Sequence, residues 1–121
     1  MTTECVARNA TRGTVLGDRV AIAESIGARL RGLLGTRELP RRHGLLIRPC
    51  KQVHSFFMQY ALDLVFVDRA GRVLRTVADF RPSRVSPYVW SAASVLELPA
   101  GTLVETPAEP GDVVAIEPQT R

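Results

Sequence analysis

The segment Leu62-Asp63-Leu64-Val65-Phe66-Val67-Asp68-Arg69-Ala70-Gly71 decides the fold. Four consecutive apolar residues, Leu64 to Val67, lack the alternation of a half-buried strand, so they predict a strand that is buried on both faces. The next four residues, Asp68 to Gly71, have the composition of a tight turn in which Gly71 supplies a positive φ. The segment therefore predicts an internal β-strand that leads into a hairpin.

Short candidate strands, divided by Gly and Pro turns, extend over the chain on both sides of this hairpin. Gly17 and Asp18 predict a turn, so we expect the residues from Leu16 to Ala23 to form the centre of an N-terminal hairpin. Prolines at positions 82 and 87 predict an irregular loop from Arg81 to Pro87, and Pro99-Ala100-Gly101 predicts a turn. The expected strands are Glu4–Arg8, Thr14–Leu16, Arg19–Ala23, Leu45–Arg48, Val53–Met58, Asp63–Asp68, Arg72–Phe80, Ser94–Leu98 and Asp112–Glu117.

Only one stretch of the chain has the periodicity of a helix. Ile26, Leu30, Leu33 and Leu34 fall at i, i+4, i+7 and i+8, and Gly35 follows in the position that often ends a helix. This pattern predicts one short amphipathic helix near residues 25–34. Many short strands with one helix indicate a mainly β fold, either a β-sandwich or a partly open barrel. The length of 121 residues fits a single domain over residues 1–121.

The net charge of +4 is concentrated in an arginine-rich stretch. Such a stretch could bind phosphate or a nucleic-acid backbone through residues 29–48, or it could be a solvated face. No aromatic side chains are interleaved with the arginines, so base stacking is missing and the solvated face is favoured over nucleic-acid binding. The basic residues of the stretch are Arg29, Arg31, Arg37, Arg41, Arg42, Arg48 and Lys51.

The N-terminal residues lack a basic region followed by an apolar run, so no signal peptide is expected. The apolar stretches are much shorter than the ~20 residues of a membrane helix, so we expect no membrane association. These features predict a cytoplasmic protein, whose two cysteines are free thiols rather than a disulfide.

The densest group of chemically distinctive side chains lies between Cys50 and Met58. Cys50, His54 and Met58 are spaced four residues apart, so they share one face of a strand, at about 13 Å for each interval. Thiolate, imidazole and thioether suit Zn²⁺ or Cu(I), provided that a bend brings the three groups together. The alternative is that Cys50 and Met58 fill the core and that His54 is a hydrogen-bonded buried imidazole.

An enzymatic interpretation of the same block would use Cys50 as the nucleophile of a small hydrolase or transferase. His54 would be the base and Asp63 would orient it. No glycine-flanked nucleophile elbow or phosphate-cradling loop accompanies these residues, so the sequence assigns no catalytic residue. At the start of a buried strand, Asp63 has the ordinary alternative of a structural carboxylate with satisfied hydrogen bonds.

Three aromatic residues flank the predicted loop at residues 81–87. Phe80, Tyr88 and Trp90 could line a recognition groove, or they could plug one end of the fold. The candidate ligand-binding residues are therefore Cys50, His54, Met58, Asp63 and Trp90.

Several blocks of the sequence, taken in order, resemble the widespread prokaryotic family catalogued as domain of unknown function 192. The similarity runs from about residue 20 to residue 116 and implies a compact, mainly β fold of sandwich type with a small helical component. It implies no activity. Many relatives carry Trp-Met-Lys-Asn where this chain has Phe57-Met58-Gln59-Tyr60, and the chain is similar to a shorter bacterial version with Cys and His before the Met. The matching blocks are Arg31-Gly32-Leu33-Leu34-Gly35, Gly44-Leu45-Leu46-Ile47, Val53-His54-Ser55-Phe56-Phe57-Met58, Leu62-Asp63-Leu64-Val65-Phe66-Val67-Asp68, Leu96-Glu97-Leu98-Pro99-Ala100-Gly101 and Gly111-Asp112.

The leading hypothesis from the sequence is a non-enzymatic binding or accessory module. Its site would centre on the block from Cys50 to Met58, and it would take a protein partner, a small ligand or a metal ion. The alternatives are the cysteine-dependent enzyme and the phosphate- or nucleic-acid-binding protein.

Overall fold

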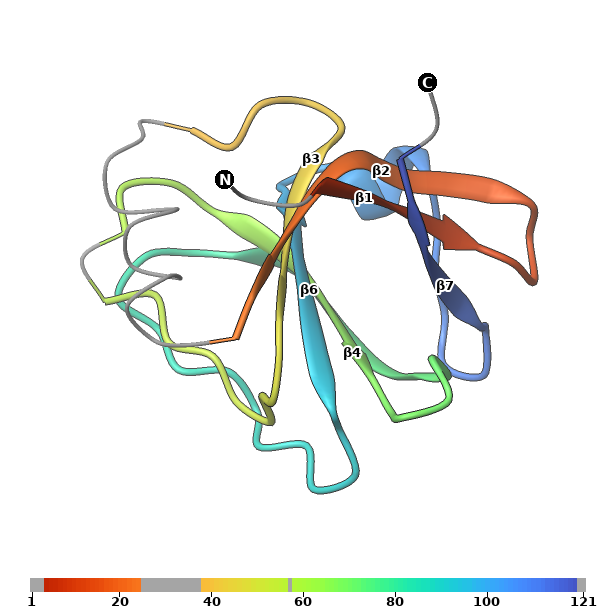
Figure 1. The fold of residues 1–121 in the computed structure, drawn as a ribbon. Coiled ribbons are helices and arrows are strands. Elements are labelled where there is room, and N and C mark those ends of the chain that lie inside the picture. Colours follow the sequence, from red (N-terminus) through yellow and green to blue (C-terminus); the bar gives the residue numbers. More distant parts are fainter. Residues whose placement is uncertain (1–3, 25–37, 57, 120–121) are drawn as a thin grey trace.

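The computed structural model describes residues 4–24, 38–56 and 58–119, which form seven β-strands and one short helix (Figure 1). The predicted helix near residues 25–34 lies outside the described residues. A helix of four residues that the sequence analysis did not predict, α2, directly follows the predicted turn at Pro99-Ala100-Gly101. The elements are β1 (Glu4–Asn9), β2 (Thr14–Ala23), β3 (His43–Ile47), β4 (Leu62–Val67), β5 (Val73–Phe80), β6 (Ser94–Pro99), α2 (Thr102–Glu105) and β7 (Val114–Pro118).

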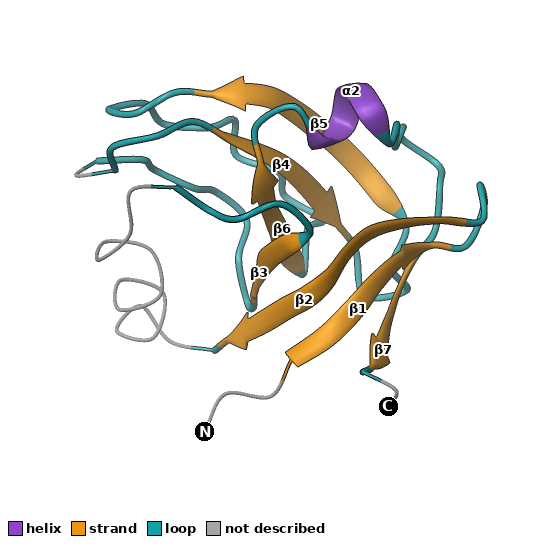
Figure 2. Cartoon of the chain, turned by 90° about the horizontal axis from the view of Figure 1, so that it is seen from above, coloured by secondary structure: helices purple, strands orange, loops and turns teal. Residues whose placement is uncertain are grey.

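The strands form one mixed sheet in the order β5-β4-β6-β3-β2-β1-β7. The pair β2–β3 is parallel, and the other neighbours are antiparallel. The sheet curls so far that the start of β5 reaches the residues before β7, where Arg72 and Val113 form an isolated bridge (Figure 2). The sheet is not closed along these edges. The predicted mainly β fold is confirmed, in the form of a partly open barrel.

Strand β4 separates two apolar clusters, as its sequence predicts. All six of its residues are buried. Val65 and Val67 belong to a barrel core to which every strand of the sheet contributes, whereas Leu62, Leu64 and Phe66 belong to an outer core on the opposite face. Because successive side chains of a strand point to opposite faces, a strand between two cores must be apolar at nearly every position.

The predicted turn after β4 is also confirmed, and it links the two edges of the partly open barrel. The amide of Gly71 donates to the carbonyl oxygen of Asp68 at 3.0 Å, and Gly71 has a φ of 86°. The carbonyl oxygen of Gly71 accepts a hydrogen bond from the amide of Val114, and the amide of Val73 donates to the carbonyl oxygen of Asp112. The turn thus joins one edge of the sheet to the other.

The predicted N-terminal hairpin is wrong in its position. Strand β2 runs without interruption through Gly17 and Asp18, and the hairpin turn lies earlier, at residues 10–13. A Cβ atom on Gly17 would lie 3.1 Å from the carbonyl oxygen of Arg42, which also accepts hydrogen bonds from the amides of Asp18 and Arg19. The glycine therefore serves a close approach between two backbones rather than a turn.

A buried polar network fixes the segment that precedes β7. The Asp112 carboxylate accepts hydrogen bonds from the Asn9 amide at 3.0 Å, from Arg12 Nε at 2.7 Å and from the Glu109 backbone amide at 3.0 Å. These three donors, with the Asn9 amide as the largest contributor, lower the pKa of Asp112 from 3.8 to about 2. The network holds Asp112 in the position at which its backbone carbonyl oxygen accepts the hydrogen bond from the amide of Val73.

Gly71→Ala tests whether the barrel closure contributes to stability. An alanine at this φ costs about 1–2 kcal/mol, and its Cβ would also collide with the carbonyl oxygen of Val114. We expect the free energy of unfolding, measured by urea denaturation, to fall by more than about 2 kcal/mol. The control is Gly101→Ala, because Gly101 has a φ of 96° with no atom within 4 Å of the added Cβ. Equal losses in the two variants would contradict the proposed importance of the closure.

Asp112→Asn tests the buried network through its pH dependence. A carboxylate whose pKa is lower in the folded state stabilises the fold above its unfolded pKa, and this contribution is lost as the pH falls through the folded value. We expect Asp112→Asn to be less stable than the wild type at pH 7, with a gap that narrows between pH 3.8 and about 2. Urea denaturation at a series of pH values measures the gap. Asp18→Asn, which removes an exposed ion pair with Arg42, is the control with a small effect. A gap that stays constant with pH would contradict the assignment.

Candidate binding surface on the paired loops

Two loops, at residues 50–56 and 83–93, pair with each other over the outer core, and we call them the paired loops. The amide of Ser55 donates to the carbonyl oxygen of Arg84, the amide of Ser86 to that of Val53, and the amide of Val89 to that of Lys51. The predicted strand Val53–Met58 is wrong, because only His54 forms a bridge there, with Val85. Hydrogen bonds between serine hydroxyl groups and the backbone take the place of the regular backbone hydrogen bonds of paired strands. The amide of Val53 donates to Ser86 Oγ at 2.9 Å, and Ser55 Oγ donates to the carbonyl oxygen of Arg81 at 2.6 Å.

Burial alternates along the first of the paired loops. Val53 and Ser55 are buried, whereas His54 and Phe56 are exposed, with their rings stacked at 5.1 Å between centroids. The alternation gives the loop an inner face against the outer core and an outer face toward solvent.

The two sulfur-bearing residues of the predicted site lie on the inner side. Cys50 and Met58 are half-buried, and both pack against the outer core and against a small cluster formed by Ala23, Leu45 and Ile47. The thiol of Cys50 donates to the carbonyl oxygen of Gln52 at 3.2 Å. This placement agrees with the interpretation of both residues as core fillers.

The predicted metal ligands are therefore divided between two environments. The two sulfur atoms share an apolar setting, whereas the imidazole of His54 lies on the exposed face. Within residues 4–24, 38–56 and 58–119, no three or more His, Cys, Asp or Glu side chains converge as a metal site. This arrangement does not fit a single Zn²⁺ or Cu(I) ion bound by Cys50, His54 and Met58, and binding of such an ion stays a prediction.

Asp63 serves the fold through both of its carboxylate oxygens. The side chain is fully buried, and it accepts hydrogen bonds from the amides of Asp79 at 2.9 Å and Leu103 at 2.8 Å. It thereby ties the end of β5 and the start of α2 to β4. These contacts correspond to the structural alternative that the sequence left open for this residue.

Trp90 is the most exposed aromatic side chain among the described residues, at 79%. Its ring packs edge-on against Tyr88, with 4.7 Å between centroids. The Nζ atom of Lys51 donates to the carbonyl oxygens of Trp90 at 2.7 Å and Ala92 at 2.8 Å, which fixes the loop. Phe80, which the sequence analysis grouped with these two rings, is buried in the outer core instead.

Exposed apolar side chains occur on both of the paired loops. Phe56 is 45% exposed, Val85 54% and Tyr88 48%, and together with Trp90 we call these residues the aromatic surface. His54 and Trp90 therefore lie on adjoining loops, while Cys50 and Met58 lie beneath them. Phe56 and Val85 were not selected from the sequence, and Lys51 was named only as part of the arginine-rich stretch. Segments 48–60 and 81–93 contain no Asp or Glu, and this shared feature could have linked them.

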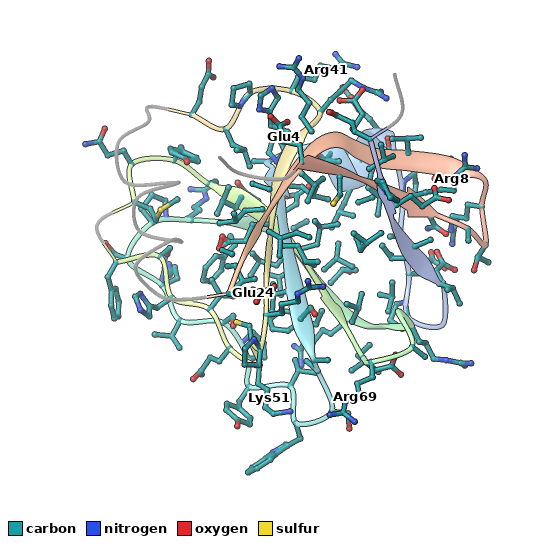
Figure 3. The ribbon with its side chains drawn as sticks, viewed as in Figure 1. Glu4, Arg8, Glu24, Arg41, Lys51 and Arg69 are labelled. Atoms are coloured by element: carbon teal, nitrogen blue, oxygen red, sulfur yellow. The ribbon has the colours of Figure 1, made fainter. Side chains whose placement is uncertain are left out.

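The described members of the arginine-rich stretch do not act as one basic patch. Arg41 pairs with Glu105, Arg42 with Asp18 and Arg48 with Glu24. Figure 3 places Arg41 at the opposite end of the molecule from Lys51. This arrangement resembles a solvated face more than a continuous phosphate-binding surface.

No helix among the described residues is long and apolar enough to cross a lipid bilayer.

Comparisons with known proteins place the chain among proteins of unknown function. Residues 7–116 match the model of the family DUF192, described as "Uncharacterized ACR". A "UPF0127 protein" of Thermococcus sibiricus is 30% identical over 110 residues, which cover 88% of this chain and 71% of the relative. A protein of the same description from Thermococcus gammatolerans is 28% identical over 116 residues, which cover 88% of this chain and 72% of that protein.

Two solved structures share the fold. One is a protein of unknown function from Novosphingobium aromaticivorans, with a TM-score of 0.77 and 22% identity over 94% of this chain and 84% of that one. The other, from Sinorhizobium meliloti, is described as "a putative transcription regulator", with a TM-score of 0.76 and 23% identity over 96% and 94% of the two chains. At these identities the likeness concerns the fold alone. The family model, which matches nearly the whole described sheet, shows that the chain belongs to the DUF192 family of uncharacterised proteins.

Proposed function

We propose that the protein is a non-enzymatic binding module that docks an acidic partner protein through the aromatic surface. The observation that carries the proposal is the 79% exposure of Trp90 on a loop that hydrogen bonds hold in place. Exposure of a tryptophan side chain is unfavourable in free energy, because its large apolar ring remains in water.

The loop that carries Trp90 is organised before any partner arrives. Lys51 donates to two carbonyl oxygens of the loop, and the amide of Ala92 donates to the carbonyl oxygen of Val89. A side chain on a fixed backbone loses less conformational entropy on binding. Trp and Tyr are also the residues that most often dominate the binding energy of protein interfaces.

The charge around the aromatic surface selects for an acidic partner. The two loop segments contain four basic residues and no acidic ones. Arg48 and Arg81 are neutralised by neighbouring carboxylates. Lys51 and Arg84 form no ion pair with any residue that the structure describes. Two uncompensated cations beside an apolar anchor match an acidic rim around an apolar pocket.

The small number of cations on the two loops argues against nucleic acid and anionic membranes as partners. Tight binding to nucleic acid typically neutralises about 6–10 phosphates, far more than two cations provide. An anionic membrane would gain only about 1 kcal/mol for each cation near its surface. The aromatic surface therefore lacks the charge that tight binding to nucleic acid needs.

A displayed library of random peptides tests the proposal without a known partner. Selection against the wild-type protein should enrich peptides that combine Asp or Glu with a large apolar residue. Trp90 is the only tryptophan, so synthetic copies of these peptides should shift its fluorescence to shorter wavelength as its ring becomes buried. Trp90→Ala should weaken their binding by about thirtyfold, the effect of a central interface residue.

The matched control is Val104→Ala, because Val104 is 81% exposed on α2, outside the aromatic surface. This variant should bind the selected peptides as the wild type does, and both variants should unfold at the wild-type urea concentration. Failure to enrich acidic peptides, or peptides that bind Trp90→Ala unchanged, would contradict the proposal. Binding of phosphatidylglycerol vesicles or single-stranded DNA that depends on Trp90 would replace the protein partner with another class.

A further inference from the structure

A cleft opens at the mouth of the barrel, and none of its lining residues belongs to the aromatic surface. Its outer part has a volume of about 450 Å³, and its inner part has about 240 Å³. Arg48, Asp68, Arg69 and Ser94 line both parts, so the two are continuous. The outer volume lies in the range of about 300–1,000 Å³ that is usual for small-molecule sites. We call this feature the barrel-mouth cleft.

The floor of the inner part is the barrel core itself. Leu46, Val67, Leu96 and Val114 line it, and all four belong to the barrel core, against which the fifth apolar lining residue, Ile116, also packs. Gly71 completes the wall where the two edges of the sheet meet. An apolar group that entered here would extend the barrel core and leave water.

The rim of the cleft carries two guanidinium groups, which differ in their partners. Arg48 forms an ion pair with Glu24 at 3.1 Å. Asp68 is engaged within its own turn, where Oδ1 accepts hydrogen bonds from the amides of Ala70 and Arg72 at 2.9 Å. Arg69 forms no ion pair with any residue in the described part of the chain. In Figure 3, Arg69 lies toward the lower end of the molecule and Glu24 lies nearer its middle.

The arrangement of a charged rim in front of an apolar floor defines the chemistry of a ligand. The rim carries Arg48 and Arg69 together with Glu24 and Asp68, and of its two guanidinium groups Arg69 is the one without an ion pair among the described residues. An apolar floor lies behind the rim. A guanidinium group can bind a carboxylate through two parallel hydrogen bonds. The volume of the inner part limits the apolar portion to a short chain or a single ring.

We propose that the barrel-mouth cleft binds a small organic carboxylate, with Arg69 contacting the carboxylate and the apolar body resting on Leu96 and Val114. This site is independent of the partner-binding surface proposed above, since none of its named residues belongs to the aromatic surface.

Titration with octanoate, followed by ¹H–¹⁵N NMR, tests the proposal on the full chain. We expect the amide signals of Arg69, Gly71, Ser94 and Leu96 to shift with a Kd on the order of 1 mM or below, as suits a ligand of this size. Acetate has the charge without the chain, and octylammonium has the chain with the opposite charge. Neither should shift these signals at the same concentration.

The matched pair of variants is Arg69→Gln and Arg75→Gln. Both remove an exposed arginine, but only Arg69 lines the cleft, whereas Arg75 lies on β5. We expect Arg69→Gln to weaken octanoate binding about fivefold to tenfold and Arg75→Gln to leave it unchanged. Equal binding by both variants, shifts spread over the aromatic surface, or equal binding of octylammonium would overturn the proposal. Absence of any shift with octanoate would overturn it as well, and it would leave the peptide-binding proposal untouched.

Discussion

The structure depends on the contact at which the two edges of its single sheet meet. Gly71 and Val73 on one side exchange backbone hydrogen bonds with Asp112 and Val114 on the other. Without this contact the two edge strands, β5 and β7, would lose the backbone link that holds them together beside the barrel core. The Asn9–Arg12–Asp112 network supports the contact from behind, because it fixes the segment that Val73 meets. A glycine turn and a buried carboxylate, about 40 residues apart in the sequence, thus jointly determine whether the sheet curls into a barrel.

Strand β4 and its turn could be predicted from the sequence because their signals are local. A run of apolar residues followed by Asp68 and Gly71 has few structural alternatives. The turn predicted at Gly17 was wrong, because the role of this glycine depends on the carbonyl oxygen of Arg42, which is 25 positions away. The paired loops could not be predicted for the same reason, since Ser55 and Ser86 act on backbone groups about 30 residues distant. Local patterns carry no information about such contacts.

The candidate site was predicted in part. The sequence selected the block from Cys50 to Met58 and the residue Trp90, and the structure places Cys50, His54, Met58 and Trp90 on or beneath the paired loops. Spacing alone could not divide the block into an inner face with Cys50 and Met58 and an outer face with His54. That division follows from the outer core, because side chains toward it must be apolar. The cleft was missed altogether, since its lining comes from four strands and from neighbouring loop segments, and its floor is ordinary core.

The sheet order has a further consequence for synthesis on the ribosome. Strand β1, the first strand of the sheet to be made, lies between β2 and β7. The hairpin β1–β2 can form before the other strands, but one side of β1 has no partner until residues 114–118 have left the exit tunnel. A nascent chain therefore presents an unpaired strand while β3 to β6 are made, when pairing with another nascent chain is the competing outcome. The last strand converts this vulnerable intermediate into the finished barrel.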